Sequence, residues 1–275
     1  MKKYATILSI AGSDCSGGAG IQADLKAISA LGGYAATAIT AITVQNTTGV
    51  RAIHSVPPVF VRGQIEAVMD DIHPDAIKIG MINDVEIVKV IAFCLRRYKP
   101  RFVVFDPVMV STSGHKLIED DAIGALTKEL MPLSTLITPN LSEAEVLTGR
   151  ALHSVEDMKT AAVELLKFGC KAVLLKGGHL EGGKMCDVLQ IADEQAPHLF
   201  TSDKIESKNT HGTGCTLSSS IATLLALGHN LPDAVKRAKD YVTGGIEQGK
   251  EIYIGEGHGP LNHFYAPVPM NIKEE

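Results

Sequence analysis

The sequence lacks an excess of positive charge. Among its 275 residues there are 26 Lys and Arg against 31 Asp and Glu, which gives a formal net charge of −5 at pH 7. Proteins that bind nucleic acid through its phosphates present a basic field, and this composition offers none. We therefore do not expect nucleic acid to be a partner.

Long hydrophobic runs are also missing, and we expect no signal peptide. No apolar run reaches the roughly 18 residues that a membrane-spanning helix needs, because Thr, Gly or charged residues interrupt the longest ones. The chain runs from Met1 into a short apolar segment of strand length, followed by Gly12 rather than by a small-residue cleavage site. We expect a soluble, cytoplasmic protein without a membrane partner.

Paired cysteines are absent as well. The five cysteines stand singly, without Cys-x-x-Cys pairs or histidines at metal-ligand spacing: Cys15, Cys94, Cys170, Cys186 and Cys215. Neither a disulfide framework nor a zinc site is indicated. Four of the five are expected to be structural or incidental, because a free cysteine commonly packs as a small buried hydrophobic residue.

Two hydrophobic patterns alternate along the chain. Apolar runs of strand length alternate with helical periodicity as far as Lys176, which is typical of βαβ units and a mainly parallel sheet. After Lys176 short strands with glycine-rich turns predict a small antiparallel edge, and two long helices follow. We expect one α/β domain over residues 1–275, with helices on both faces of a central sheet in three layers.

Hydrophobic period and turn residues together set the bounds of the expected elements. The predicted strands are Tyr4–Ala11, Tyr34–Val44, Ala76–Ile79, Phe102–Phe105, Thr135–Thr138, Ala172–Leu175, Lys184–Ala192 and His198–Thr201. The predicted helices are Ile21–Leu31, Val59–Ile72, Val85–Tyr98, Asp120–Met131, Glu143–Thr148, Val155–Phe168, Thr216–Leu227 and Pro232–Gln248. The tail, Pro260–Glu275, is expected to be irregular.

Polar residues stand where the predicted strands end. Gln45 follows the second strand, Asp106 the fourth and Lys176 the sixth. In an open parallel sheet, ligands bind beyond the carboxyl ends of the strands, so these side chains should meet at one rim. Turns are polar wherever they occur, but an acid, amides and a lysine together favour a binding site.

One glycine-rich segment, Gly178–Lys184, has the glycine and lysine spacing of a P-loop. Met185 stands where the metal-binding Ser or Thr of a P-loop belongs, and a strand rather than a helix is predicted to follow. We therefore expect a hairpin or a flexible lid at this segment rather than a nucleotide-binding loop.

A second segment, Gly18–Ala23, is similar to a dinucleotide-binding fingerprint. It lies well beyond the end of the first strand, however, and Gln45 stands where an acidic ribose ligand is expected. A dehydrogenase is therefore not indicated. The loop Ser16–Gly20 would still let a substrate approach the backbone closely, with Asp24 on the helix that follows, and an ordinary flexible turn is the alternative.

The motif Gly212-Thr213-Gly214-Cys215 comes directly before a predicted helix. Glycines at a helix start leave backbone N–H groups at the positive end of the helix dipole, which favours binding of a phosphate or of charge developing during its transfer. Cys215 would lie in the first turn, where its thiol pKa should be lowered, making it a base or a nucleophile. The alternative is a glycine-rich helix start with a buried thiol.

Asn140 and Glu143 allow two interpretations. An Asn followed three residues later by Glu is the pattern of a helix capping box. With Asp106 at a neighbouring strand end, however, Glu143 could hold a hydrated magnesium ion, which prefers oxygen ligands. The position of these residues at the strand ends favours the second interpretation.

Taken in order, these motifs closely resemble those of the bacterial hydroxymethylpyrimidine/phosphomethylpyrimidine kinases. The resemblance extends from about Thr6 to Phe264. The segments that carry it are Ala11–Asp24, Thr43–Thr47, Lys78–Met81, Asp106–Val108, Thr138–Asn140, Lys176–His179 and Asn209–Cys215. So many ordered motifs over nearly the whole chain make the resemblance specific.

The resemblance implies a ribokinase-like α/β fold, usually homodimeric, and two successive ATP-dependent phosphorylations of the pyrimidine precursor of thiamine. The first acceptor is the 5-hydroxymethyl group, and the second is the phosphate monoester that results. By position, the residues that look like pyrimidine contacts are Gln45, Met81, Asp24, Gly12 and Val108.

Phosphoryl transfer depends mostly on positioning and charge stabilisation, so the remaining roles follow by position. Asp106 and Glu143, with Asn140, are expected to arrange Mg²⁺ and its water. The residues expected to neutralise the transferring phosphoryl group are Lys176, Gly212 and Gly214, and those expected to contact the nucleotide are Thr210, His211, Lys176 and Asn140.

Cys215 stands where sugar kinases of the superfamily carry an aspartate base. It is expected to accept the alcohol proton in the first transfer, whereas the second acceptor is already anionic and needs no comparable base.

Three other functions stay open. A pyridoxal kinase of the same superfamily would also phosphorylate a hydroxymethyl group on a heteroaromatic ring. A transferase or hydrolase with Cys215 as nucleophile would need a paired histidine, for which His211 is the nearest candidate. A binding module without catalysis would leave Asp106, Glu143 and Lys176 without an evident task.

Overall fold

The computed structural model describes residues 2–109, 120–177 and 183–274. Within these residues a nine-stranded sheet runs in the order β10-β9-β8-β7-β6-β5-β2-β3-β4. Its strands are β2 (Thr6–Asp14), β3 (Tyr34–Asn46), β4 (Gly49–Ser55), β5 (Ala76–Ile79), β6 (Val103–Phe105), β7 (Leu136–Ile137), β8 (Ala172–Leu175), β9 (Lys184–Ile191) and β10 (His198–Asp203). The centre of the sheet, from β3 to β8, is parallel, and both edges are antiparallel.

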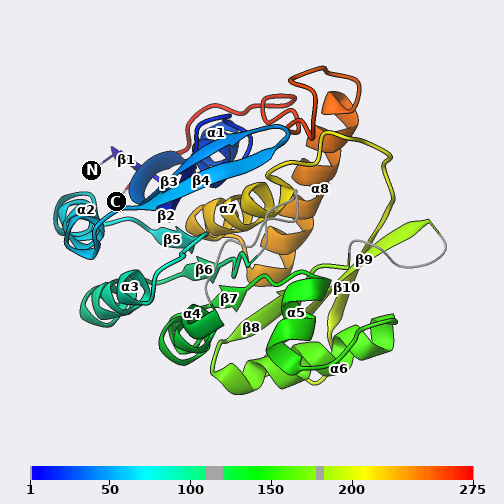
Figure 1. Cartoon of the computed structure of the whole chain (residues 1–275), viewed down its shortest axis with the longest axis horizontal. Helices are drawn as coiled ribbons and strands as arrows, with labels where there is room; N and C mark the ends of the chain where they lie inside the picture. Colours follow the sequence, from blue (N-terminus) through cyan, green and yellow to red (C-terminus); the bar gives the residue numbers. More distant parts are fainter. Residues whose placement is uncertain (1, 110–119, 178–182, 275) are drawn as a thin grey trace.

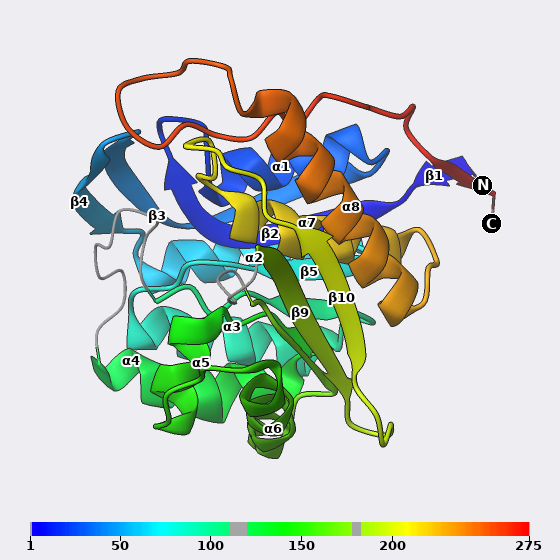
Figure 2. The same ribbon diagram turned by 90° about the vertical axis from the view of Figure 1, so that its right-hand side faces the viewer.

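Helices cover both faces of the sheet, which confirms the three-layer α/β arrangement expected from the sequence (Figure 1). Figure 2 shows the two helical layers on opposite sides, with α8 above the sheet and α6 below it. One layer holds α1 (Gly20–Ala30), α7 (Thr213–Ala226) and α8 (Leu231–Gly249). The other holds α2 (Pro58–Asp71), α3 (Val85–Tyr98), α4 (Asp120–Ala125), α5 (Leu141–Thr148) and α6 (Val155–Leu165). None of the described helices is both long and apolar enough to cross a membrane.

Strand β5 contributes side chains to the hydrophobic cores on both faces of the sheet. Successive side chains of a strand point to opposite faces of the sheet. Ile77 and Ile79 accordingly pack in the core under α2 to α6, whereas Ala76 packs in the core under α7 and α8. Lys78 alternates with the two isoleucines and is fully buried on the α7 side. A buried lysine needs a partner, and its partner is described with the site.

Three short strands were not expected from the sequence. Strand β4 pairs antiparallel with β3, which itself continues past Val44 to Asn46. Strand β4 was missed because it is a half-exposed edge strand with Arg51 and His54 among its few apolar residues. In the tail, β11 (Ile272–Glu274) pairs with β1 (Lys2–Tyr4), although an irregular tail was predicted.

Other boundaries differ by a few residues. The first predicted strand, Tyr4–Ala11, corresponds to β2, which begins at Thr6, and Tyr4 belongs instead to the separate strand β1. The predicted helix Asp120–Met131 is α-helical only as far as Ala125, and a π-helical turn, Leu126–Leu130, continues it. The predicted hairpin or lid, Gly178–Lys184, lies outside the described residues except for its last two positions.

Candidate active site

A cleft of about 1200 Å³ runs along the carboxyl ends of the parallel strands, where the sequence predicts the site. The order of the sheet places β2, β3 and β5 at one end of this cleft and β8 to β10 at the other. The predicted site residues that line it are Gly12, Gln45, Met81, Asp106, Val108, Asn140, Glu143, Lys176, Thr210, His211, Gly212, Gly214 and Cys215. The structure therefore brings these residues together, while their individual roles stay predictions.

Asp24 is the exception, and its placement among the substrate contacts is corrected by the structure. It is fully buried in α1, and Lys78 Nζ lies 2.9 and 2.8 Å from its two carboxylate oxygens. Ser9 on β2 donates to one oxygen at 2.5 Å, and Ser219 on α7 donates to the other. The carboxylate thus joins four elements beneath the cleft, and its oxygens are occupied by protein donors.

The start of α7 lies against the glycine-rich loop after β2. Gly212 begins the helix with a φ of 80°, and no side chain caps it. A β-carbon on Gly212 would lie 1.9 Å from the carbonyl oxygen of Gly18, so only glycine fits. A β-carbon on Gly214 would lie 3.4 Å from both Lys176 Nζ and Asp106 Oδ2. An anion beside Gly214 would therefore meet the positive helix end and an ammonium group together.

Buried Asp106 and partly exposed Lys176 form an ion pair next to that helix start. Asp106 Oδ1 accepts hydrogen bonds from Lys176 Nζ and from Thr138 Oγ1, both at 2.9 Å. Burial alone would lower the pKa of Lys176, but the negative charges of Asp106 and Glu143 raise it. The amine therefore stays protonated at neutral pH and can neutralise negative charge in the cleft.

The capping box at Asn140 and Glu143 is confirmed. Glu143 N–H donates to Asn140 Oδ1, and Asn140 N–H donates to Glu143 Oε2 at 2.8 Å. The same carboxyl is buried, and burial raises its pKa to about 7 although the charge of Lys176 opposes the rise. Among the described residues no cluster of three or more His, Cys, Asp and Glu could hold a metal ion. Two carboxylates, those of Asp106 and Glu143, remain as hard oxygen donors. Two such donors suit Mg²⁺ when water and phosphate oxygens complete its coordination shell.

The prediction of a lowered pKa for Cys215 is wrong. Burial raises the pKa of the thiol to about 11, and the opposing effects of the Lys78 charge and the Gly20 N–H do not compensate. The position at a helix start suggested an ionised thiolate, but the depth of burial cannot be read from that position. Cys215 is a protonated thiol at neutral pH and acts as a base only through a small ionised fraction.

The end of the cleft near β2, β3 and β5 combines an apolar wall with an amide. Met81 packs with Ala41 and Val108. A β-carbon on Gly12 would lie 2.6 Å from the methyl carbon of Met81, so the glycine leaves room for this wall. The side chain of Gln45 adds donors and acceptors at the end of β3. Such a surface suits a flat heteroaromatic ring with a hydrogen-bonding edge.

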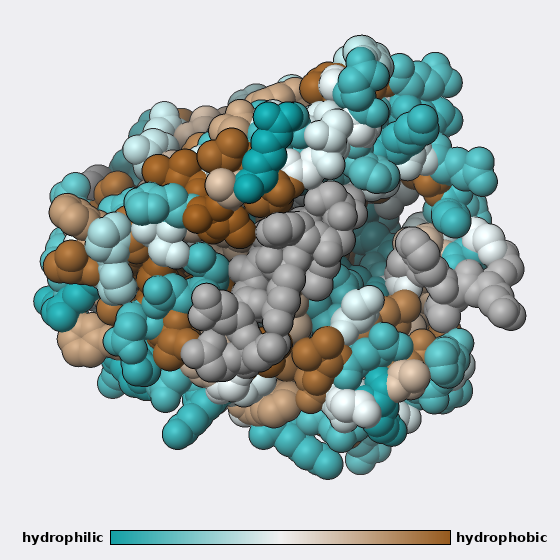
Figure 3. Space-filling model, in the orientation of Figure 1, coloured by the Kyte–Doolittle hydropathy of each residue, from teal (hydrophilic) through white to brown (hydrophobic). Residues whose placement is uncertain are grey.

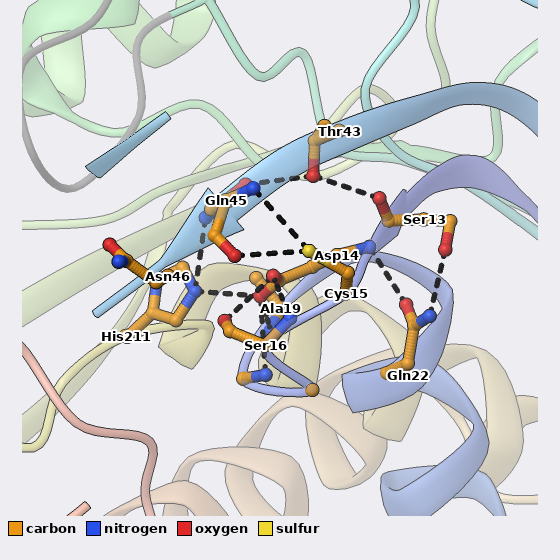
Figure 4. Close-up of polar contacts among 12 residues, drawn as sticks. Ser13, Asp14, Cys15, Ser16, Ala19, Gln22, Thr43, Gln45, Asn46 and His211 are labelled. Atoms are coloured by element: carbon orange, nitrogen blue, oxygen red, sulfur yellow. Dashed lines mark hydrogen bonds and ion pairs between the residues drawn. The ribbon is translucent and has the colours of Figure 1, made fainter. Parts of the chain in front are cut away.

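Asp14 and His211 connect the two glycine-rich segments at the same end (Figure 4). His211 Nε2 lies 2.8 Å from Asp14 Oδ2, and a β-carbon on Gly18 would lie 2.3 Å from the histidine ring. From the sequence no role was assigned to Asp14, because its partner lies 197 residues away. The predicted contact of His211 with nucleotide phosphates stays a prediction, and its Nε2 is occupied by Asp14.

The opposite end of the cleft, near β9, carries a second ion pair. Leu217 and Val242 add apolar side chains to the lining of the cleft, and Thr210 lines it next to His211. Lys239 Nζ lies 2.5 Å from Asp187 Oδ2 at its edge. An apolar wall beside a cation suits the base and phosphates of a nucleotide. Two subsites thus flank the helix start of α7.

A phosphoryl group could pass between these subsites across the start of α7, where positive charge is fixed in advance of any reaction. This arrangement at the carboxyl edge of a mainly parallel sheet fits a small-molecule kinase of the ribokinase-like class. Comparison with known proteins narrows the class, since residues 14–262 match the family model described as phosphomethylpyrimidine kinase. The chain belongs to the phosphomethylpyrimidine kinase family.

Curated relatives agree with this assignment. The chain is 48% identical over 262 residues to the hydroxymethylpyrimidine/phosphomethylpyrimidine kinase of Rhizobium meliloti, covering 95% of this chain and 97% of the relative. It is 49% identical over 261 residues to a thiamine biosynthesis bifunctional protein of Geobacter sulfurreducens. This match covers 95% of the chain but only 52% of the relative, so the chain spans about half of the bifunctional protein.

Solved structures are similar over nearly the same length. The phosphomethylpyrimidine kinase of Clostridium difficile is 46% identical with a TM-score of 0.78, covering 88% of this chain and 99% of that one. The pyridoxal kinase of Staphylococcus aureus in complex with AMP-PCP and pyridoxal is 34% identical with a TM-score of 0.86, covering 98% of each chain. Fold similarity alone therefore does not separate the two kinase activities.

Proposed function

We propose that this chain transfers a phosphoryl group from ATP to 4-amino-5-hydroxymethyl-2-methylpyrimidine and then to the monophosphate, a pair of reactions in thiamine biosynthesis. The observation that carries the proposal is the pocket of Gln45, Met81 and Val108, which lies in one cleft with Cys215 and Lys176. Family membership and the names of the curated relatives support it.

In the first reaction the hydroxymethyl oxygen attacks the γ-phosphorus, and the bond from that phosphorus to the bridging oxygen of ADP breaks. The alcohol proton passes to the ionised form of Cys215. In the second reaction an oxygen of the monophosphate attacks a new γ-phosphorus, and no alcohol proton has to leave. Lys176 and the start of α7 neutralise the charge of the group in transfer.

The test is a time course with the pyrimidine, excess ATP and Mg²⁺, in which the products are separated by chromatography. We expect the monophosphate to appear first and the diphosphate to follow, with two ATP consumed for each pyrimidine converted fully. Absence of phosphorylation of both the pyrimidine and its monophosphate would refute the proposal.

We also propose that Asp106 and Glu143 hold Mg²⁺, which supplies charge neutralisation to the phosphates when bound. Exchanging Glu143→Gln should raise the Mg²⁺ concentration for half-maximal rate by about tenfold or more in both reactions, because a carboxylate ligand is lost. Gln at this position still satisfies the capping box, so the melting temperature should change little.

The pH dependence of the same measurement distinguishes a ligand from a capping residue. Burial raises the pKa of Glu143 to about 7, so the carboxyl is protonated below neutrality and ionised above it. The wild-type Mg²⁺ requirement should therefore increase as pH falls from 8 to 6. In Glu143→Gln that additional increase should be absent. An unchanged Mg²⁺ requirement in the variant would contradict the metal role.

A homodimer and a cytoplasmic location, both predicted from the sequence, are retained as proposals. The observation that supports a dimer is the group of apolar side chains over the β3–β4 hairpin, where Ile42 and Val44 are 51% and 54% exposed (Figure 3). Exposed apolar patches on an edge of a sheet favour association. Sedimentation should then give twice the chain mass of 29.2 kDa, and a monomer at micromolar concentration would contradict the proposal.

Pyridoxal kinase is the second candidate function. Its support is the 34% identity and full-length similarity to the Staphylococcus aureus enzyme, whose structure contains pyridoxal. Pyridoxal also carries a hydroxymethyl group on a flat heteroaromatic ring, so the apolar wall of Met81 and Val108 would accept it. We propose it as a slower side activity.

A further inference from the structure

Asp14 is surrounded by hydrogen-bond donors (Figure 4). Its Oδ1 accepts from Ser16 N–H at 2.9 Å and from Ser16 Oγ at 2.7 Å, and its Oδ2 accepts from Ala19 N–H at 2.8 Å and Gly18 N–H at 3.2 Å. Burial alone would raise the pKa of Asp14, but the hydrogen bonds from His211 and Ser16 hold it well below its ordinary value. The side chain is therefore a carboxylate and can only accept hydrogen bonds.

The proton on His211 follows from this charge. Its Nε2 lies 2.8 Å from Asp14 Oδ2. A carboxylate and an unprotonated ring nitrogen would repel each other at that distance, so Nε2 carries a hydrogen. This conclusion holds whether the imidazole is neutral or positively charged. The single hydrogen on Nε2 points mainly to Asp14, and Nε2 has no lone pair left to accept a hydrogen bond from any other neighbour.

The side-chain amide of Gln45 is one of those neighbours, and it touches Thr43 on its other side. Gln45 Nε2 lies 3.2 Å from His211 Nε2, and Gln45 Oε1 lies 3.2 Å from Thr43 Oγ1. Thr43 Oγ1 is also 2.9 Å from the carbonyl oxygen of Ser13, which can only accept. The single hydroxyl hydrogen of Thr43 is therefore used by Ser13. With the Gln45 amide oriented in this way, its NH₂ group faces the N–H of His211, and its oxygen faces the Thr43 oxygen, which has no hydrogen left to donate.

A rotation of the amide by 180° removes both conflicts. Amide oxygen and nitrogen have nearly the same shape, and only the hydrogen-bond partners distinguish them. We infer that Gln45 Oε1 is the second, longer acceptor of the His211 Nε2–H that is shared with Asp14, and that Gln45 Nε2 donates to Thr43 Oγ1. Asp14 and His211 thereby act as positioning residues that set the donor and acceptor order read by the substrate ring. This inference rests on the proposed function, because it assigns Gln45 to the acceptor subsite.

The order matters because related rings present opposite patterns. On the amino-pyrimidine an amino donor at C4 lies beside the acceptor N3. On the 4-oxo analogue an oxygen acceptor lies beside an N3–H donor, so the order is reversed. A fixed amide matches one order only, whereas an amide that rotates freely can match either. Hydrogen-bonding sites discriminate strongly when a mismatch leaves buried polar groups unpaired.

The experiment compares kcat/KM for the amino-pyrimidine with kcat/KM for its 4-oxo analogue. We expect the wild-type protein to prefer the amino ring by about 100-fold or more. His211→Phe removes the donor and should reduce that preference by about tenfold, with little change in KM for ATP. His211→Gln should restore most of the preference, since its amide N–H lies as many bonds from the Cα atom as the histidine Nε2. Ser16→Ala removes a hydrogen-bond donor from Asp14 Oδ1, the oxygen that does not contact His211. It is the matched control for the effect of a loosened loop alone.

An unchanged preference in His211→Phe would overturn the inference. A rise in KM for ATP with an unchanged preference would also overturn it and would place His211 at the nucleotide instead. Equal use of both rings by the wild-type protein overturns the inference but leaves the proposed function intact.

The amide orientation can be tested without any substrate. In the protein labelled with ¹⁵N, nuclear Overhauser contacts from the Gln45 NH₂ group to Thr43 are expected. Contacts from that NH₂ group to the ring protons of His211 instead would overturn the inference, even if the pyrimidine were not the acceptor.

Discussion

Replacing Cys215 with alanine slows the first phosphorylation by about 100-fold or more and changes the second by no more than a few-fold, because only the first acceptor has an alcohol proton to lose. Product-resolved rates with the hydroxymethylpyrimidine and with its monophosphate as separate starting acceptors measure the two effects. Cys94→Ala, which removes a thiol of α3 that does not line the cleft, is the matched control and should leave the ratio of the two rates unchanged. Equal losses in both reactions of Cys215→Ala would contradict the base role.

The pH dependence sharpens this expectation. With a thiol pKa of about 11, roughly one Cys215 in ten thousand is ionised at pH 7, and the ionised fraction rises about tenfold for each pH unit below the pKa. The first reaction should accelerate accordingly between pH 7 and 9. The second reaction, and the first reaction of Cys215→Ala, should lack this slope. A wild-type profile that is flat in this range would show that the thiolate is not the base.

Replacing Lys78 with methionine destabilises the fold by about 3–5 kcal/mol, because the Asp24 carboxylate then remains buried without a counter-charge. Burial alone would lower the pKa of Lys78, but the charge of Asp24 raises it, so the Lys78 amine is protonated at neutral pH. Urea unfolding followed by circular dichroism measures the change in the free energy of unfolding. A change below about 1 kcal/mol, the range of exposed ion pairs, would contradict a buried pair that the fold depends on.

Two controls separate charge from packing. Lys236→Met breaks an exposed ion pair with Asp240 and should alter stability far less than Lys78→Met. The double variant Lys78→Met with Asp24→Asn leaves no buried charge and should recover part of the loss. Failure of the double variant to recover any stability would mean that packing rather than charge dominates.

The buried pair also explains why the site is held in place. Ser219 on α7 donates to Asp24, whose carboxylate is bonded to β2 through Ser9 and to β5 through Lys78. The helix that begins with Gly212 is therefore tied to the two strands beneath the acceptor subsite. The position of Gly214 beside Asp106 depends on that attachment. Loss of the pair should thus reduce activity even in molecules that remain folded.

The elements with a clear hydrophobic pattern could be predicted from the sequence. The parallel strands were found because they are short continuous apolar runs, and most helices because their apolar residues repeat at about 3.6 residues. Strand β4 was missed, since an edge strand with Arg51 and His54 has no such period. The rim of strand ends was also predicted, because in a parallel sheet all carboxyl ends meet on one side.

The sequence could not predict properties that depend on depth or on distant partners. Burial decides the pKa of Cys215, and a position at a helix start does not reveal burial. Asp24 looked like a ligand because its partner Lys78 is 54 residues away. The same reason hid the contact between Asp14 and His211, which comes from the first parallel strand and the last glycine-rich turn. In each case tertiary packing, not local pattern, sets the chemistry.

The choice of acceptor is tested by comparing kcat/KM for the hydroxymethylpyrimidine with kcat/KM for pyridoxal, measured with Mg²⁺ and ATP on the same preparation. We expect the pyrimidine to be preferred by at least about tenfold, since the Gln45 amide can pair with its amino group and adjacent ring nitrogen. We also expect conversion of the pyrimidine as far as the diphosphate. A higher kcat/KM for pyridoxal, or a reaction that stops at the pyrimidine monophosphate, would contradict the proposed function.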